Sequence, residues 1–331
     1  MGAATRVDAL ARERHHAEHL YPIWLALPKR LRGKFYVHPR LIEGASAAGV
    51  EAVSCVDMSD PGPVTLVAAY RDLKWARNRG RKVIVSEHGA GQSYVGVTSG
   101  SYLGALDRAG VVAVLVPGHD AARRHAATHP TVPAYVVGCP KLDRWHGAKP
   151  PRGEKKIAIS FHWDCKVCPE TQGAWNHYRQ IIPHLAERFP MLGHAHPRLA
   201  GSRVRAFYER WGIEFVEDFD EVIERATVYV VDNSSTLYEW AALDRPCVVM
   251  NAPWYRRDVE HGLRFWSHAD VGPIVNRPKD LIAAIPKALE DPPEIAKRRR
   301  EIVRDVYGVP LGEASRAAAT AVCEIARKWS G

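Results

Sequence analysis

Three short polar segments of this sequence follow apolar runs, and their side chains suit proton transfer and the binding of an anion. Within residues 83–96, an apolar run ends in Glu87-His88-Gly89. Histidine titrates near neutrality, so His88 is a candidate general base. Gly89 allows the backbone to approach a ligand closely. The alternative is an ordinary histidine before a glycine turn.

A second run, residues 191–197, ends in His196-Pro197 and is followed by Arg198. Proline favours extended geometry in the residue before it, which predicts that His196 lies at a strand end. There it could donate a hydrogen bond to a pyrophosphate, and Arg198 is a further candidate contact. A surface histidine beside a turn is the alternative.

The third segment, residues 227–251, reads as strand, turn, helix and strand. Asp232 and Asn233 form the expected turn, and Ser234 and Ser235 open the helix. The first backbone N–H groups of a helix have no partner within it, so this start predicts a phosphate site. Glu239, one turn further on, could accept hydrogen bonds from sugar or ribose hydroxyls. The alternative is that Ser234 only caps the helix and Glu239 is solvated.

These segments lie in an alternating pattern of apolar runs and amphipathic stretches, which is typical of an α/β protein with parallel strands. The runs expected to form strands are residues 51–56, 64–70, 81–87, 111–117 and 133–138 in the first half, and 156–163, 191–197, 213–218, 227–233 and 246–253 in the second. Helices are expected near 171–188, 201–211, 219–226 and 234–243, and from Asp280 onward.

The proline-, glycine- and lysine-containing stretch 147–156 predicts a linker. We expect an N-terminal, acceptor-side domain over 1–150, a nucleotide-donor-binding domain over 151–290, and helices packing across both over 291–331. Two successive open sheets should face each other across a crevice that binds ligands at their strand ends.

In this order, the three segments resemble the motifs of the CDP-glycerol:poly(glycerophosphate) glycerophosphotransferase family of teichoic acid assembly. The matching motifs are His88-Gly89, His196-Pro197, and Asp232-Asn233-Ser234-Ser235 with Glu239, and the resemblance covers roughly residues 64–290. It implies a GT-B fold with two Rossmann-like domains.

The resemblance also implies roles for these residues. His88 would deprotonate an acceptor hydroxyl, and His196 would stabilise the departing pyrophosphate. Gly89, Ser234 and Ser235 would bind the donor phosphates. Asp232, Asn233 and Glu239 would bind the nucleotide or the transferred group. No metal ion and no cofactor are expected.

The chain differs from the family pattern before the His-Gly motif at Glu87 and after it at Ala90, Gln92 and Ser93. It differs also at His194 and at Asn233. The expected donor is therefore either CDP-glycerol or a UDP- or GDP-sugar, and the acceptor is a hydroxyl of a polymer, glycan or protein, with an anionic acceptor among the candidates. A nucleotide-sugar 2-epimerase and a non-catalytic basic binding protein for an anionic polymer remain alternatives.

Composition fits a folded protein of 331 residues with 46% hydrophobic and 25% charged residues. The formal charge of +9 is concentrated in residues 1–150, which carry 20 Lys/Arg against 12 Asp/Glu. This favours an anionic partner, although a well-solvated surface is the alternative. No apolar run reaches the roughly 18 residues of a membrane span, so we expect a cytoplasmic protein. Residues 19–34 form either a first core helix or a peripheral membrane contact.

Other features of the sequence give weaker indications of function. Cys165 and Cys168, near His162 and His177, could suggest zinc, but a single C-x-x-C pair favours two free thiols. Residues 254–266 interleave basic and aromatic side chains, which makes Arg256 and His261 candidate contacts of the donor base or acceptor, although an ordinary amphipathic helix explains them too. No phosphate-loop or G-x-S-x-G motif is present, and nucleic acid is not an expected partner.

Overall fold

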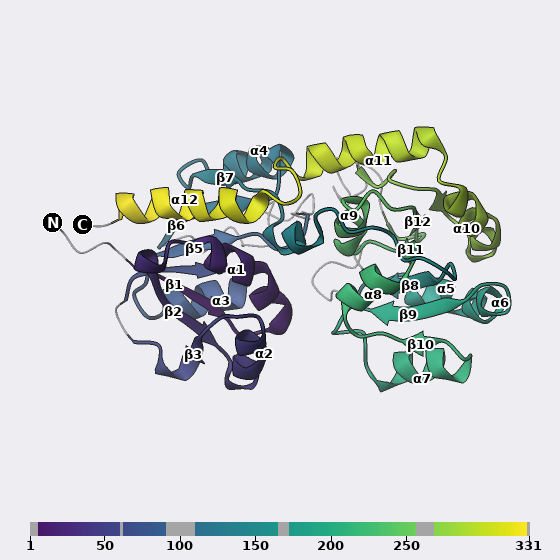
Figure 1. Ribbon diagram of the computed structural model, residues 1–331, viewed down its shortest axis with the longest axis horizontal. Helices are drawn as coiled ribbons and strands as arrows, with labels where there is room; N and C mark the ends of the chain where they lie inside the picture. Colours follow the sequence, from purple (N-terminus) through teal and green to yellow (C-terminus); the bar gives the residue numbers. More distant parts are fainter. Residues whose placement is uncertain (1–5, 60–61, 91–109, 165–171, 256–267, 330–331) are drawn as a thin grey trace. The chain divides into compact units, whose positions relative to one another are not determined.

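The computed structural model describes residues 6–59, 62–90, 110–164, 172–255 and 268–329 (Figure 1). The chain forms two compact units. The first contains the described residues of Met1–Gly91, Gly96–His146 and Arg304–Gly331, and the second contains those of Gly147–Val303. The end of the chain therefore belongs to the same unit as its beginning.

The N-terminal unit is built on a parallel sheet of seven strands in the order β3-β2-β1-β4-β5-β6-β7. The central order 3-2-1-4-5-6 is that of a Rossmann sheet, whose topological switch point lies between β1 and β4. The strands are β1 Val7–Ala11, β2 Arg32–Val37, β3 Ala52–Ser54, β4 Val64–Val67, β5 Val83–Ser86, β6 Val111–Val116 and β7 Ala134–Val136.

Helices cover both faces of this sheet. They are α1 Arg14–Ala26, α2 Ile42–Ala47, α3 Tyr70–Arg77, α4 His119–Thr128 and α12 Ala314–Lys328, with 3-10 turns at Lys29–Leu31, Pro39–Leu41, Cys55–Asp57 and Pro140–Trp145. One core cluster joins the sheet to α1 and α12, for example through Leu20 and Val322. The other joins it to α3 and α4, for example through Leu73 and Ala121.

A buried ion pair lies within this unit. Asp8 of β1 is 4% exposed and Arg81 is 1% exposed, and their Oδ2 and Nη1 atoms are 2.6 Å apart. The other Asp8 oxygen accepts the backbone N–H of Lys34 in β2. Gly33 permits this approach, because a Cβ atom there would lie 2.1 Å from Oδ1 of Asp8. The buried carboxylate of Asp8 thus links β1 to β2 through Lys34 and to the segment before β5 through Arg81.

The C-terminal unit has a six-stranded parallel sheet in the order β10-β9-β8-β11-β12-β13. Counted from β8, this is again the 3-2-1-4-5-6 order, and its switch point lies between β8 and β11. The strands are β8 Ile157–Phe161, β9 Met191–Ala195, β10 Glu214–Phe215, β11 Val228–Val231, β12 Cys247–Met250 and β13 Ile274–Val275. The helices are α5 Trp175–Tyr178, α6 Ile182–Ala186, α7 Ser202–Arg210, α8 Phe219–Arg225, α9 Thr236–Ala241, α10 Leu281–Glu290 and most of α11 Pro293–Val306, with 3-10 turns at Arg179–Ile181 and Pro278–Asp280.

A buried arginine of α11 fastens two turns of the C-terminal unit. Arg299 is fully buried, and its guanidinium binds Asp244 at 3.1 Å and Asp291 at 2.9 Å. Both aspartates have positive φ angles, 52° and 45°, a conformation that residues other than glycine rarely adopt. Arg299 therefore holds two strained turns in place.

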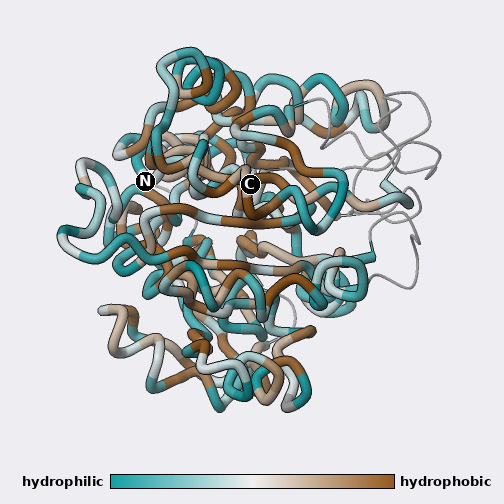
Figure 2. Tube along the Cα trace, turned by 90° about the vertical axis from the view of Figure 1, so that its right-hand side faces the viewer, coloured by the Kyte–Doolittle hydropathy of each residue, from teal (hydrophilic) through white to brown (hydrophobic). Residues whose placement is uncertain are grey.

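The α/β prediction is confirmed, and each of the ten apolar runs contains a strand. The strands are buried, and Figure 2 shows hydrophobic stretches of the trace running through the interior. The sequence prediction missed β1, β2 and β13. Residues 19–34 contribute Leu20, Ile23 and Trp24 of α1 to the core, as a first core helix would. In the described part of the chain, the helices are too short or too polar to cross a membrane.

Candidate functional site

The switch point of the C-terminal sheet is bridged by Asp232, the residue that follows β11. One of its carboxylate oxygens accepts the backbone N–H of His162, which follows β8, at 2.8 Å. The other accepts the backbone N–H of Ala174 at 2.8 Å. Asp232 therefore fixes the loops at the strand ends, and both of its oxygens face the protein backbone.

Asp232 is fully buried. Loss of solvation raises the pKa of its carboxyl group to about 7, although the N–H groups of Ala174 and His162 favour the charged form. The group thus changes its charge near neutral pH.

His196 directly follows β9, next to β8 in the sheet, and its backbone N–H binds the carbonyl of Phe161 at 2.9 Å. Its Nδ1 accepts the backbone N–H of Arg198 at 3.1 Å. Because a backbone amide can only donate, the neutral ring carries its proton on Nε2. His196 is therefore oriented as a hydrogen-bond donor through Nε2.

Two aromatic residues that the sequence analysis did not assign to the donor site, His162 and Trp163, lie beside His196. The ring centroids of His162 and His196 are 5.3 Å apart, and those of Trp163 and His196 are 5.9 Å apart. The guanidinium of Arg198 lies over Trp163, 4.6 Å from the ring centroid. His162 follows its strand as His196 follows β9, so the same strand-end pattern could have identified it.

Ser234 and Ser235 lie immediately before a helix, close to the helix start that the sequence predicts. α9 begins at Thr236, and Ser235 is its N-terminal flanking residue. The hydroxyl of Ser234 accepts hydrogen bonds from the backbone N–H of Thr236 at 3.4 Å and from its hydroxyl at 2.8 Å. Asn233 is fully buried and accepts the hydroxyl of Tyr255 at 3.2 Å. The Ser234 hydroxyl therefore contacts the first residue of α9, whereas the N-cap position belongs to Ser235, which makes no side-chain cap hydrogen bond.

Glu239 is 2% exposed, so its interpretation as a solvated helix residue is wrong. The helix α9 buries the neighbouring Leu237, Tyr238 and Trp240 as well. A buried carboxylate one turn from Ser235 fits the predicted role of a hydroxyl acceptor.

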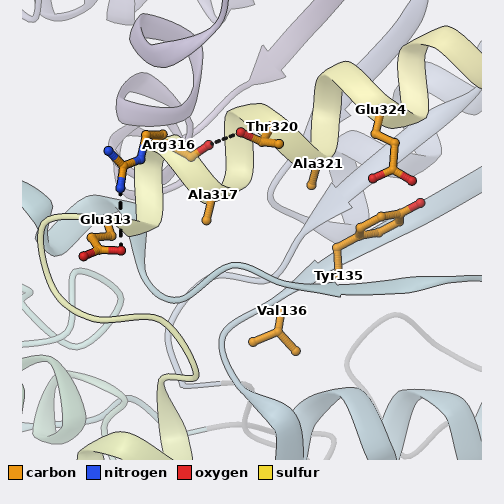
Figure 3. A pocket seen from close by; sticks show the side chains of 8 residues that line it. All are labelled: Tyr135, Val136, Glu313, Arg316, Ala317, Thr320, Ala321 and Glu324. Carbon is orange, nitrogen blue, oxygen red and sulfur yellow. Dashed lines mark hydrogen bonds and ion pairs between the residues drawn. The ribbon is translucent and has the colours of Figure 1, made fainter.

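Two surface pockets lie outside these strand ends. One, of about 400 Å³, lies between β7 and α12, where Arg316 and Glu313 form an ion pair at 3.7 Å (Figure 3). The other, of about 490 Å³, adjoins the turn after His196; its lining residues are Trp175, Asn176, Arg179, Leu199, Gly201, Arg203, Val204 and Phe207.

His88 lies in the N-terminal unit, just after β5, and is half-buried. Its Nδ1 lies 2.7 Å from the carbonyl oxygen of Ala68, which follows β4. A carbonyl can only accept, so Nδ1 carries the proton of the neutral ring and Nε2 holds a lone pair. Gly89 has a φ of +77°, which glycine adopts without strain. His88 is therefore oriented as a base.

Three histidines of α1 surround His88, and sequence reasoning did not select them. Their ring centroids lie 6.3 Å (His15), 5.0 Å (His16) and 6.0 Å (His19) from that of His88. Burial, and next the charge of Lys141, hold the pKa of His19 well below its usual value. The spacing His15-His16-x-x-His19, which suits one face of a helix, was the available signal.

Arg256, His261, Cys165 and Cys168 lie outside the described residues. The sequence predictions for them stay predictions.

The family model for CDP-Glycerol:Poly(glycerophosphate) glycerophosphotransferase matches residues 173–324. This range contains His196, the segment 232–235 and Glu239, whereas His88 precedes it. No curated protein matches the chain significantly.

Solved structures resemble the chain over nearly its whole length. A UDP-GlcNAc 2-epimerase from Neisseria meningitidis bound to UDP-GlcNAc has a TM-score of 0.64 at 15% identity, covering 98% of this chain and 100% of that one. S. aureus MnaA in complex with UDP has a TM-score of 0.64 at 13% identity, covering 94% of each chain. A variant of the wall teichoic acid polymerase TagF has a TM-score of 0.65 at 13% identity, covering 99% of this chain and 89% of that one.

At these identities the structural neighbours establish the fold and not the reaction. The fold is GT-B-like, as predicted. The predicted resemblance is confirmed in the C-terminal half of the chain, where residues 173–324 match the glycerophosphotransferase family, and this match supports a transferase with a nucleotide-activated donor.

Proposed function

We propose that this protein transfers a glycerophosphate group from a CDP-activated donor to an acceptor hydroxyl. The observation that carries the proposal is the tautomer of His196: its Nδ1 accepts the N–H of Arg198, so the neutral ring carries its proton on Nε2, where it can be donated. The matching family model, and the similarity to a TagF variant whose crystal was soaked with CDPG, support the same donor class.

In the proposed reaction, the acceptor oxygen forms a bond to the β-phosphorus of the donor, and the bond from that phosphorus to the bridging oxygen breaks. Nε2 of His88 takes the acceptor proton. Negative charge grows on the departing CMP, and His196 Nε2 with the groups at Ser234 and Ser235 stabilises it. Donors fixed in advance lower such a barrier because they need no reorganisation.

Asp232 is a positioning residue in this proposal, because its oxygens bind the backbone of the His162 and Ala174 loops. Glu239 is the proposed acceptor for donor hydroxyls. Arg198, held over Trp163, is a candidate contact for the nucleotide phosphate.

The released nucleotide tests the proposal. Purified protein is incubated with CDP-glycerol and a glycerophosphate-primed acceptor, and in parallel with UDP-GlcNAc. Release of CMP with growth of the acceptor supports glycerophosphate transfer. Release of UDP would indicate sugar transfer instead, because the sugar–oxygen bond then breaks. Conversion of UDP-GlcNAc without acceptor, or tight donor binding with no turnover, would overturn the proposal in favour of an epimerase or a binding protein.

A further inference from the structure

The first turn of α1 lies at the switch point of the N-terminal sheet, since α1 follows β1 directly and β1 is paired with β4. Ligands of open parallel sheets bind at such points. Glu13, His15 and His16 lie there, each within reach of the other two: one ligand atom from each residue lies within 4.8 Å of the others.

The geometry is close to that of a coordination site. Nδ1 of His15 lies 3.7 Å from Oε2 of Glu13, and the rings of His15 and His16 have centroids 3.9 Å apart. Two ligands of one tetrahedral ion at about 2.0–2.1 Å lie roughly 3.4 Å apart. The side chains of His15 and Glu13 are 30% and 31% exposed, so this pair has room to close by its remaining few tenths of an ångström, while the ligand atoms of the full set lie within 4.8 Å of one another.

The carboxylate of Asp72 lies near the imidazole of His16. Nδ1 of His16 lies 3.8 Å from Oδ2 of Asp72, and Asp72 is itself held by Arg12 Nε at 2.7 Å. When Nε2 of His16 takes an ion, Nδ1 therefore faces a fixed carboxylate. Metal-bound histidines characteristically have such a partner, which orients the ring.

Two imidazoles and one carboxylate favour a borderline metal ion such as Zn²⁺ over Ca²⁺ or Mg²⁺, which prefer oxygen ligands. Three protein ligands also leave a coordination position open for water or a substrate oxygen. We propose that Glu13, His15 and His16 form an open His₂Glu site that binds Zn²⁺. The proposal concerns binding alone and does not make the ion essential for transfer.

The test is calorimetric titration of Zn²⁺ into chelator-treated, dialysed protein without a polyhistidine tag. One ion per chain is expected. Glu13→Gln and His15→Ala each weaken its affinity by at least about tenfold. The matched control is His184→Ala, because Nδ1 of that exposed histidine also lies near a glutamate, 3.8 Å from Oε2 of Glu187. Circular dichroism and thermal unfolding check that each variant is folded.

Absorption of the Co²⁺-substituted protein separates this site from the cysteines. Ligand-field bands without a thiolate-to-cobalt band, lost in His15→Ala and kept in Cys165→Ser/Cys168→Ser, support the proposal. The proposal would be overturned if the protein failed to bind Zn²⁺ or if His15→Ala and His184→Ala bound it with equal affinity. It would also be overturned if the thiolate-to-cobalt band accounted for all of the bound Co²⁺.

Discussion

The carbonyl oxygen of Ala68 lies 2.7 Å from Nδ1 of His88 and fixes the proton of the neutral ring on that nitrogen. The contact joins the end of β4 to the end of β5, two neighbouring strands. Nε2 is left with the lone pair, which is the arrangement a general base requires.

His88→Ala removes this base. We expect the transfer rate to fall by about 10²–10⁴-fold, with donor affinity unchanged because the proposed donor site lies at the ends of other strands. Steady-state rates and calorimetric donor binding measure the two effects. Transfer at the wild-type rate would exclude His88 as the base.

His196→Asn keeps an acceptor for the N–H of Arg198 and removes the Nε2 donor. Loss of one donor that stabilises charge in the transition state lowers kcat by about 10²–10³-fold. His184→Ala, an exposed histidine of the same unit, serves as the control. Equal kcat values in the two variants would contradict the assigned role.

Asp232 predicts a pH-dependent stability. Its pKa is raised to about 7 in the folded protein, against about 3.9 in an unfolded chain, so the folded state binds the proton more tightly. Stability therefore falls as pH rises through this window. Asp232→Asn cannot ionise, and its free energy of unfolding relative to wild type should improve by about 3 kcal/mol between about pH 5 and about pH 8. Urea denaturation at both pH values measures it, and a constant difference would exclude the raised pKa.

Arg299 and Arg300 offer a matched pair, because both bind Asp244 but only Arg299 is buried. Arg299→Met removes the buried partner of Asp244 and Asp291, whose side chains are 46% and 31% exposed, and should lower the free energy of unfolding by about 1–3 kcal/mol. Arg300→Met removes an exposed ion pair and should cost less than about 1 kcal/mol. Chemical denaturation compares them; equal losses would show that burial does not decide the contribution.

Gly33→Ala would place a Cβ atom 2.1 Å from Oδ1 of Asp8. We expect a loss of about 1–3 kcal/mol, since the buried ion pair must shift. Gly44 of α2 has open space at the same position, so Gly44→Ala should instead stabilise the protein by about 0.5–1 kcal/mol. Thermal unfolding of both variants distinguishes them, and a neutral Gly33→Ala would mean that β2 can move away from Asp8.

Apolar runs predicted ten of the strands, because continuous β-branched residues indicate parallel strands covered on both faces. The strand β1 was not predicted because Asp8 interrupts its apolar pattern. The charge of Asp8 is compensated by Arg81, which lies 73 residues away in the sequence. No local sequence pattern reveals such a distant partner. β2 begins with Arg32, Gly33 and Lys34 and was missed for a similar reason, since charged residues interrupt its apolar pattern.

The candidate site was predicted where a histidine or serine lies within three residues of a strand end. The inward orientation of Asp232 could not be predicted, since its partners His162 and Ala174 are 70 and 58 residues away. The histidines of α1 were missed because their proximity to His88 depends on the packing of α1 against the sheet.

The position of α12 has a consequence for synthesis of the chain. Ala318, Val322 and Ile325 of this helix complete the core that α1 forms with the first sheet. These residues follow the whole second unit in the sequence, so the first unit can be completed only after the second has been synthesised. Until α12 has been synthesised, the apolar surface that it covers in the first unit is exposed to solvent. A nascent chain stalled before residue 314 should therefore depend on chaperones.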